Sequence, residues 1–178
     1  MQGKNPAPRL RACSWLHPCC ARCVIHARPT RLGAFSYRGP HRYHVRSGTW
    51  NRHPHFSDAS IACPARSQLM QLALTFGFAV HAYCFMPDHV HLLVEGTASR
   101  SWLPAFVDRW KQATAYTIGR PRGIRLWQPG YFERVLREQE SSRVMARYIM
   151  ENPIRARIAR RVGEFPFAWC LWMNDPTL

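Results

Sequence analysis

The 178-residue sequence predicts an α+β fold in which one antiparallel sheet of about four strands has helices packed on one face. Three observations predict it: β-rich runs of alternating composition, longer runs with apolar residues at helical spacing, and turn residues between neighbouring runs. Apolar residues make up 47% of the chain and charged residues 20%, which is typical of a globular protein. A chain of this length forms one domain with a substantial core.

The first half of the folded region predicts a strand, a helix and a β-hairpin. Residues 43–50 alternate as in a strand, and residues 64–75 place apolar side chains at helical spacing before a glycine ends the helix. Residues 78–85 and 89–95 are both β-rich and are separated by a Pro-Asp turn at 87–88. These two runs are therefore expected to pair as an antiparallel hairpin.

The second half predicts two longer helices on either side of a short strand. Residues 101–118 carry an apolar stripe at helical spacing and are followed by Gly and Pro, which end a helix. Residues 123–137 are expected to hold a short strand or a bent hairpin. A serine cap then starts a helix that runs to about residue 150, and a last helical segment is expected over 154–162. The order β-α-β-β-α-β-α corresponds to a ferredoxin-like sandwich.

Three regions are expected along the chain: an extension over residues 1–34, a catalytic domain over 35–170 and a C-terminal tail over 171–178. The extension is rich in Cys, Pro and Arg and is predicted to be disordered and basic. A small zinc site among its cysteines is the alternative, but their spacing fits no common zinc motif.

Basic residues dominate the charge. Lys and Arg number 25 against 10 Asp and Glu, which gives a formal net charge of +15. A field of this sign attracts polyanions, so nucleic acid is the first partner to consider and an anionic membrane surface the second. No apolar run approaches the roughly 20 residues that a membrane-spanning helix needs, and no signal peptide is evident. A cytoplasmic protein without a membrane partner is therefore expected.

His89 and His91 are two residues apart on a predicted strand, so both imidazoles should leave the same face of the sheet. Two adjacent imidazoles can hold one metal ion through neutral nitrogens. Taken alone, such a pair is more often structural, or simply part of a half-exposed strand surface that holds no metal. The position of this pair on an apolar strand, directly after a turn, favours the functional interpretation.

Tyr148 and Asn152 are four residues apart on a predicted helix and therefore share a face. Tyr148 also continues an apolar stripe, which is typical of a core tyrosine. Asn152 stands directly before a proline, where asparagine is a good helix cap. Helix geometry alone therefore favours a structural role for both residues, a core side chain for Tyr148 and a helix cap for Asn152.

Three sequence blocks carry a resemblance to a known family. They are AYCFMPDHVHLLVE at 82–95, LWQPGYFE at 126–133 and RYIMENPIRA at 147–156. In this order they resemble the HUH-superfamily single-tyrosine transposases of the REP-associated and insertion-sequence types, over about residues 35–169. The resemblance implies a DNA transposase that cleaves and rejoins single-stranded DNA through a 5′-phosphotyrosine intermediate with a divalent metal.

The resemblance also implies a role for each matching residue. His89 and His91 would hold Mg²⁺ or Mn²⁺, Asn152 would complete the metal site, and Tyr148 would be the nucleophile. Single-stranded or hairpin DNA is the implied partner of a nucleoid-associated protein, and the family includes both monomers and homodimers. Asp88 departs from the family, whose members often carry Asn or Glu in this turn, and is expected to be harmless to the metal pair. The arginines expected to bind DNA are Arg120, Arg122, Arg125, Arg143, Arg147, Arg155 and Arg157.

Three other classes of protein were weighed. A catalytically silent DNA- or RNA-binding protein on the same scaffold is the main alternative, although it would have no need to retain the histidines, the tyrosine and the asparagine together. A replication initiator or relaxase is disfavoured by the short chain and by the lack of a second tyrosine on the Tyr148 helix. A metalloenzyme that used Cys84 with the histidines would leave the net charge unexplained.

Overall fold

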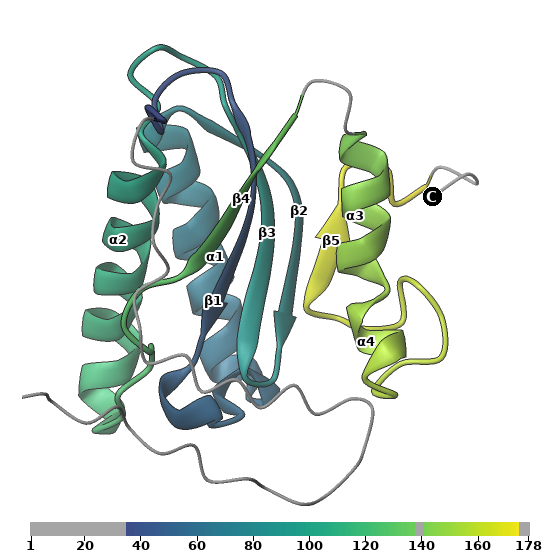
Figure 1. Ribbon diagram of the computed structural model, residues 1–178. Coiled ribbons are helices and arrows are strands. Elements are labelled where there is room, and N and C mark those ends of the chain that lie inside the picture. Colours follow the sequence, from purple (N-terminus) through teal and green to yellow (C-terminus); the bar gives the residue numbers. More distant parts are fainter. Residues whose placement is uncertain (1–34, 138–140, 175–178) are drawn as a thin grey trace, which may run out of the picture.

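A computed structural model describes residues 35–137 and 141–174. The chain forms one five-stranded antiparallel sheet with the strand order β4-β1-β3-β2-β5 (Figure 1). The strands are β1 (Arg42–Gly48), β2 (Phe78–Met86), β3 (His89–Gly96), β4 (Phe132–Leu136) and β5 (Ala168–Cys170). The predicted extension over 1–34 and the residues 175–178 of the predicted tail lie outside the described residues, so the domain boundaries stay predictions.

Helices cover both faces of this sheet. The long helices α1 and α2 lie side by side on one face, which confirms the predicted arrangement, and α3 lies across the other face (Figure 1). The helices are α1 (Ala59–Phe76), α2 (Leu103–Thr114), α3 (Ser142–Met150) and α4 (Asn152–Arg155). Short helical turns precede α1 and follow α2: η1 (Trp50–Arg52) and η2 (His55–Ser57) come before α1, and η3 (Ala115–Gly119) and η4 (Arg120–Arg122) come after α2.

The helix α1 begins five residues before the predicted start at Pro64. Asp58 caps it by accepting a hydrogen bond from the backbone N–H of Ser60 at 2.7 Å. Pro64 lies inside the helix and has no N–H to donate to the carbonyl one turn earlier, that of Ser60. Arg122 donates to this carbonyl from Nη2 at 3.2 Å, so the proline leaves no unsatisfied acceptor.

The last helical segment is shorter than predicted. The helix α4 ends at Arg155, and the prediction of a helix over 154–162 is wrong beyond this point. Arg157 adopts a left-handed conformation with φ of 59°, which interrupts a right-handed helix. The strand β5 was not predicted, because three residues are too few to show an alternating pattern.

Alternation along the strands gives the sheet two different faces. On β3, Val90, Leu92 and Val94 join the large core under α1 and α2, which includes the fully buried Phe106 and Trp110. This core supplies most of the buried apolar surface and therefore most of the folding free energy.

A smaller core lies under α3. It joins Cys84 of β2 and Leu93 of β3 to Ala146, Ile149 and Met150 of the helix. The apolar face of α3 therefore packs against the same sheet face that carries His89 and His91. The small core fixes which way the remaining side chains of α3 point.

We expect Gly96→Ala to destabilise the fold. A Cβ at Gly96 would overlap the backbone carbonyl oxygen of Gly39, and neither backbone can yield without breaking the hydrogen bond from Gly96 N–H to His41 O. Overpacking of this kind costs about 1–3 kcal/mol, and each kcal/mol lowers the melting temperature by about 2–4 °C in a chain of this size. Thermal unfolding followed by circular dichroism measures the change, with the exposed substitution Ser99→Ala as control. An unchanged melting temperature in Gly96→Ala would show that the Gly39 segment moves aside freely.

Candidate active site

The register between β1 and β3 brings new residues to the predicted histidines. Arg46 is paired with His91, and Gly48 with His89. Directly opposed residues of an antiparallel pair share a face of the sheet, so His44 and Arg46 lie on the α3 face together with His89 and His91. Neither His44 nor Arg46 was predicted as a site residue. The signal that could have found them is their alternation along the predicted strand, which places both on one face.

Three histidines and one carboxylate form a continuous chain of contacts at hydrogen-bonding distance. The Nδ1 atom of His89 lies 2.6 Å from Asp88 Oδ1, and its Nε2 atom lies 3.1 Å from Nε2 of His91. On the other side of its ring, His91 Nδ1 lies 2.9 Å from His44 Nε2. Each of the two predicted metal histidines therefore has its Nδ1 atom held by a neighbour, and their Nε2 atoms meet.

This arrangement fits a metal ion at the two Nε2 atoms. A carboxylate only accepts hydrogen bonds, so the proton of neutral His89 lies on Nδ1 and its Nε2 carries a lone pair. When His91 likewise donates from Nδ1 to His44, its own Nε2 lone pair is exposed beside that of His89. Metal-binding histidines are typically held in this way by an acceptor behind the ring. Two nitrogens 3.1 Å apart match neighbouring ligands at about 2.1 Å from one ion, at near right angles.

Burial keeps the histidine chain neutral. Burial first, and then the nearby positive groups, lower the pKa of His91 to about 2 and that of His44 to about 4. The pKa of His89 is also lowered by burial, against the opposing effect of Asp88. At neutral pH all three imidazoles are therefore uncharged, which is the form that coordinates metals.

Asp88 is more than a turn residue. Its Oδ1 atom contacts His89, and its Oδ2 atom forms a 2.7 Å ion pair with Nε of Arg52. Burial alone would raise the pKa of Asp88, but the hydrogen bond from His89 and the charge of Arg52 outweigh it and the pKa is lowered. Both Asn51 and Arg52 have positive φ angles, of 49° and 59°, in the turn that brings Arg52 to the carboxylate. These contacts are compatible with the expectation that Asp88 does not harm the histidine pair, and they add an orienting contact to His89.

The helix α3 places Tyr148 over the histidines. The Tyr148 ring meets the rings of His44 and His91 edge-on, at centroid distances of 5.9 and 6.2 Å. The residue is 44% exposed, so a large substrate can reach it. The core interpretation of Tyr148 is wrong, because the buried face of α3 consists of Ala146, Ile149 and Met150 instead.

Asn152 lies at the junction of α3 and α4 and satisfies the end of α3. Its Nδ2 atom donates to the carbonyl of Tyr148 at 3.0 Å and to that of Ile149 at 3.2 Å. It does not cap the start of α4, a position that Glu151 occupies. With the amide nitrogen bound to α3, the side-chain oxygen of Asn152 is the atom left for a ligand.

Arg155 contacts Tyr148 directly. Its guanidinium lies 4.4 Å from the centre of the Tyr148 ring and donates to the Tyr148 carbonyl, while Nη1 pairs with Glu151 at 2.9 Å. The Glu151 side chain is 41% exposed, so this ion pair lies at the protein surface. Arg155 was predicted to bind DNA, and its position beside the tyrosine suits a phosphate near that residue.

The remaining predicted DNA-binding arginines lie in two groups. One group comes from α3 and the segment after α4, and the other from η4 and the residues that follow it. The end of α2 that leads to η4 lies at the same end of the sheet as α4 and the β2–β3 hairpin (Figure 1). Arg122 differs from the others, because both of its terminal nitrogens donate to backbone carbonyls. All of these side chains are exposed: Arg120, Arg122, Arg125, Arg143, Arg147 and Arg157.

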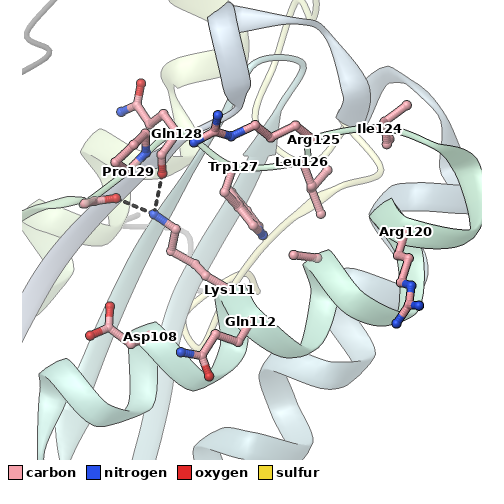
Figure 2. Close-up of a pocket in the computed structure, with 12 residues that line it drawn as sticks. Asp108, Lys111, Gln112, Arg120, Ile124, Arg125, Leu126, Trp127, Gln128 and Pro129 are labelled. Atoms are coloured by element: carbon pink, nitrogen blue, oxygen red, sulfur yellow. Dashed lines mark hydrogen bonds between the residues drawn. The ribbon is translucent and has the colours of Figure 1, made fainter.

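A shallow cavity of about 540 Å³ lies between α2 and the segment 124–130 (Figure 2). Lys111 reaches from α2 and donates to the carbonyls of Gln128 and Gly130, which holds this segment against the helix (Figure 2). The backbone N–H of Gln128 donates to Gly48 O at 3.1 Å. A Cβ on Gly48 would lie 2.7 Å from the side-chain amide of Gln128. The glycine, which is itself paired with His89, therefore leaves room for this amide.

Two features are absent from the described part of the chain. Within residues 35–137 and 141–174, no helix has the length and apolar character that crossing a membrane requires. Over the same ranges, no group of three or more His, Cys, Asp or Glu side chains is arranged to hold a metal ion. A metal at this site would therefore use the two histidines with ligands of another kind.

A strand-borne histidine pair faces a helix-borne tyrosine on an antiparallel sheet of a basic chain, an arrangement that fits a DNA-processing enzyme. Residues 39–152 match the model of the IS200-like transposase family, and the chain belongs to this family. The matched region contains all four of the predicted catalytic and metal-binding residues, and the predicted resemblance is confirmed.

Two relatives agree with this assignment. A REP-associated tyrosine transposase of Escherichia coli (strain K12) is 23% identical over 137 residues, which cover 71% of this chain and 79% of the relative. The solved structure of a REP-associated tyrosine transposase bound to a REP hairpin has a TM-score of 0.63 at 17% identity and covers 75% of this chain and 78% of that one. At this level of identity, the structural similarity shows the shared fold.

Proposed function

We propose that this transposase cleaves and rejoins single-stranded DNA beside a hairpin, through a covalent bond between Tyr148 and a 5′-phosphate. The observation that carries the proposal is the position of the exposed Tyr148 ring, edge-on to His44 and to His91, the histidine whose Nε2 atom meets that of His89. An accessible hydroxyl next to a neutral, metal-ready histidine pair suits phosphoryl transfer. Association with the nucleoid is part of this proposal.

The ion would be Mg²⁺ or Mn²⁺, held by Nε2 of His89 and of His91 and by the side-chain oxygen of Asn152. The donor set supports a weakly held, exchangeable ion, because such ions prefer oxygen ligands and two of the three donors are nitrogens. When bound, it would polarise the scissile phosphate and offset the charge on its oxygens.

Tyr148 would attack the phosphorus atom. Its hydroxyl loses a proton, the bond between phosphorus and the 3′ oxygen breaks, and that oxygen gains a proton and leaves as a 3′-hydroxyl. The 5′-phosphate stays bound to the tyrosine. Because the new phosphodiester retains the energy of the old one, a second 3′-hydroxyl can attack it and rejoin the strands without ATP.

Hairpin DNA is the proposed substrate because a relative of the same fold was solved bound to a REP hairpin. The exposed arginines near Tyr148 and after α2 would contact phosphates of this DNA. Arg155 is the most direct candidate, since it already stacks on the Tyr148 ring. Arg122 should contribute less, because its donors are already engaged with backbone carbonyls.

The proposal is tested by incubating the full chain with end-labelled hairpin oligonucleotides that carry single-stranded flanks, in the presence of Mn²⁺. We expect a covalent protein–DNA adduct that survives denaturing electrophoresis, and mass spectrometry should place it on Tyr148. Hairpins that bind without ever forming an adduct would contradict the proposal and favour a catalytically silent binding protein.

We expect Asp88→Ala to weaken Mn²⁺ binding by about 10–100-fold without unfolding the chain. The substitution removes the acceptor that holds the proton of His89 on Nδ1, so the Nε2 lone pair is no longer fixed toward His91. Titration calorimetry of the DNA-free protein measures the affinity. Asp108→Ala on α2 is the matched control. Equal affinities in Asp88→Ala and wild type would show that His89 is oriented by other contacts.

A further inference from the structure

Arg46 occupies the centre of the candidate active site. It is paired with His91 on one side and with Phe132 of β4 on the other, so its side chain leaves the sheet on the face covered by α3. It is partly buried, and its charge acts on all three histidines and on Tyr148.

The charge of Arg46 has no counter-ion in the described residues. Asp88 is the acidic group that acts on it, but both Asp88 oxygens are already engaged, one with Arg52 and one with His89. Glu133 is a neighbour along β4 but is paired with Val45 and therefore belongs to the opposite face of the sheet. Burial and the charge of Arg52 lower the pKa of Arg46, which indicates a cation held at a cost in free energy.

Neighbouring arginines are satisfied in other ways. Arg52 pairs with Asp88, and Arg155 pairs with Glu151 and stacks on Tyr148. Arg46 forms no ion pair and no hydrogen bond with any described residue. A partly buried guanidinium without a partner, on the sheet face that carries the histidines and within electrostatic reach of Tyr148, indicates that an anion completes the site.

We propose that Arg46 binds the scissile phosphate of single-stranded DNA and stabilises the charge on its non-bridging oxygens during attack by Tyr148. The inference rests on the proposed function and adds the residue that receives the phosphate. The planar fork of Arg can donate two hydrogen bonds to two phosphate oxygens at once. The anion supplies the missing counter-charge, so the favourable contact forms only when DNA is bound.

The first test compares Arg46→Met, Arg46→Lys and Arg100→Ala with wild type in the adduct assay. We expect Arg46→Met to slow adduct formation by about 10²–10³-fold, as loss of one preorganised donor does. Arg46→Lys should recover part of the rate, because it restores the charge but not the fork. Arg100 is exposed, beyond the end of β3 that lies away from His89, so Arg100→Ala should act as wild type.

Thermal unfolding separates this role from a structural one. Arg46→Met keeps an apolar stem and removes an unpaired, partly buried charge, so we expect its melting temperature to equal or exceed that of wild type. A slower reaction in a protein that is equally or more stable supports the inference. A slower reaction accompanied by a clear loss of stability would show that Arg46 supports the fold, and would overturn it.

The second test measures DNA binding alone, without strand cleavage, and all proteins in it carry Tyr148→Phe. An uncharged methylphosphonate at the scissile position should weaken DNA binding by about tenfold when Arg46 is present, and should have no further effect in Arg46→Met, since the two changes remove the same contact. Equal effects in both proteins would overturn the inference. Absence of any adduct with wild type would contradict the proposed function. The binding comparison between Arg46 and Arg46→Met would still show whether Arg46 contacts the phosphate.

Discussion

Tyr148→Phe should abolish covalent adduct formation and strand cleavage while leaving the fold and hairpin binding intact. The substitution removes only the hydroxyl oxygen. The ring contacts with His44, His91 and Arg155 all persist, because they involve the aromatic ring or the backbone. The substitution removes the proposed nucleophilic oxygen itself, so we expect the rate to fall by roughly 10³-fold or more.

Gel analysis of the adduct and titration of a labelled hairpin measure the two properties separately. Tyr116→Phe is the matched control, since Tyr116 is 64% exposed on η3 and lies outside the candidate site. An adduct that persists in Tyr148→Phe would show that another residue is the nucleophile. Loss of hairpin binding together with the adduct would show that Tyr148 acts in DNA recognition.

His91→Ala should remove Mn²⁺ binding from the DNA-free protein and with it the metal-dependent cleavage. His91 contributes one Nε2 donor and links His89 to His44, so its loss deletes a ligand and breaks the chain that orients the other. The loss of affinity should exceed the roughly 10–100-fold caused by removing a supporting residue such as Asp88.

Calorimetric titration with Mn²⁺ measures this effect, and thermal unfolding checks that the protein is still folded. His53→Ala is the matched control, because His53 is exposed in the loop between η1 and η2. His91→Ala that binds Mn²⁺ as tightly as wild type would place the ion elsewhere in the molecule.

Local sequence patterns predicted most of the fold, and the exceptions have physical causes. The hairpin and the shared face of His89 and His91 follow from alternation, which is a property of the strand itself. The start of α1 was misplaced because Pro64 usually marks a first turn, whereas a distant side chain, that of Arg122, satisfies the carbonyl that it leaves free.

The candidate site was only partly predictable, because its remaining members depend on long-range pairing. Helix periodicity favoured a core position for Tyr148, and only the family resemblance indicated a catalytic one. His44 and Arg46 meet His91 through the register between β1 and β3, two strands that are separated by an entire helix and a third strand. No local pattern specifies such a register before the sheet forms.

The alternation of β3 ties catalysis to correct folding. A shift of β3 by one residue would turn His89 and His91 into the large apolar core and expose Val90 and Leu92 beneath α3. Such a misfolded molecule would bury polar rings and lose the candidate site in one step. The hydrophobic contacts that complete the sheet are therefore also the ones that bring the residues of the candidate site together.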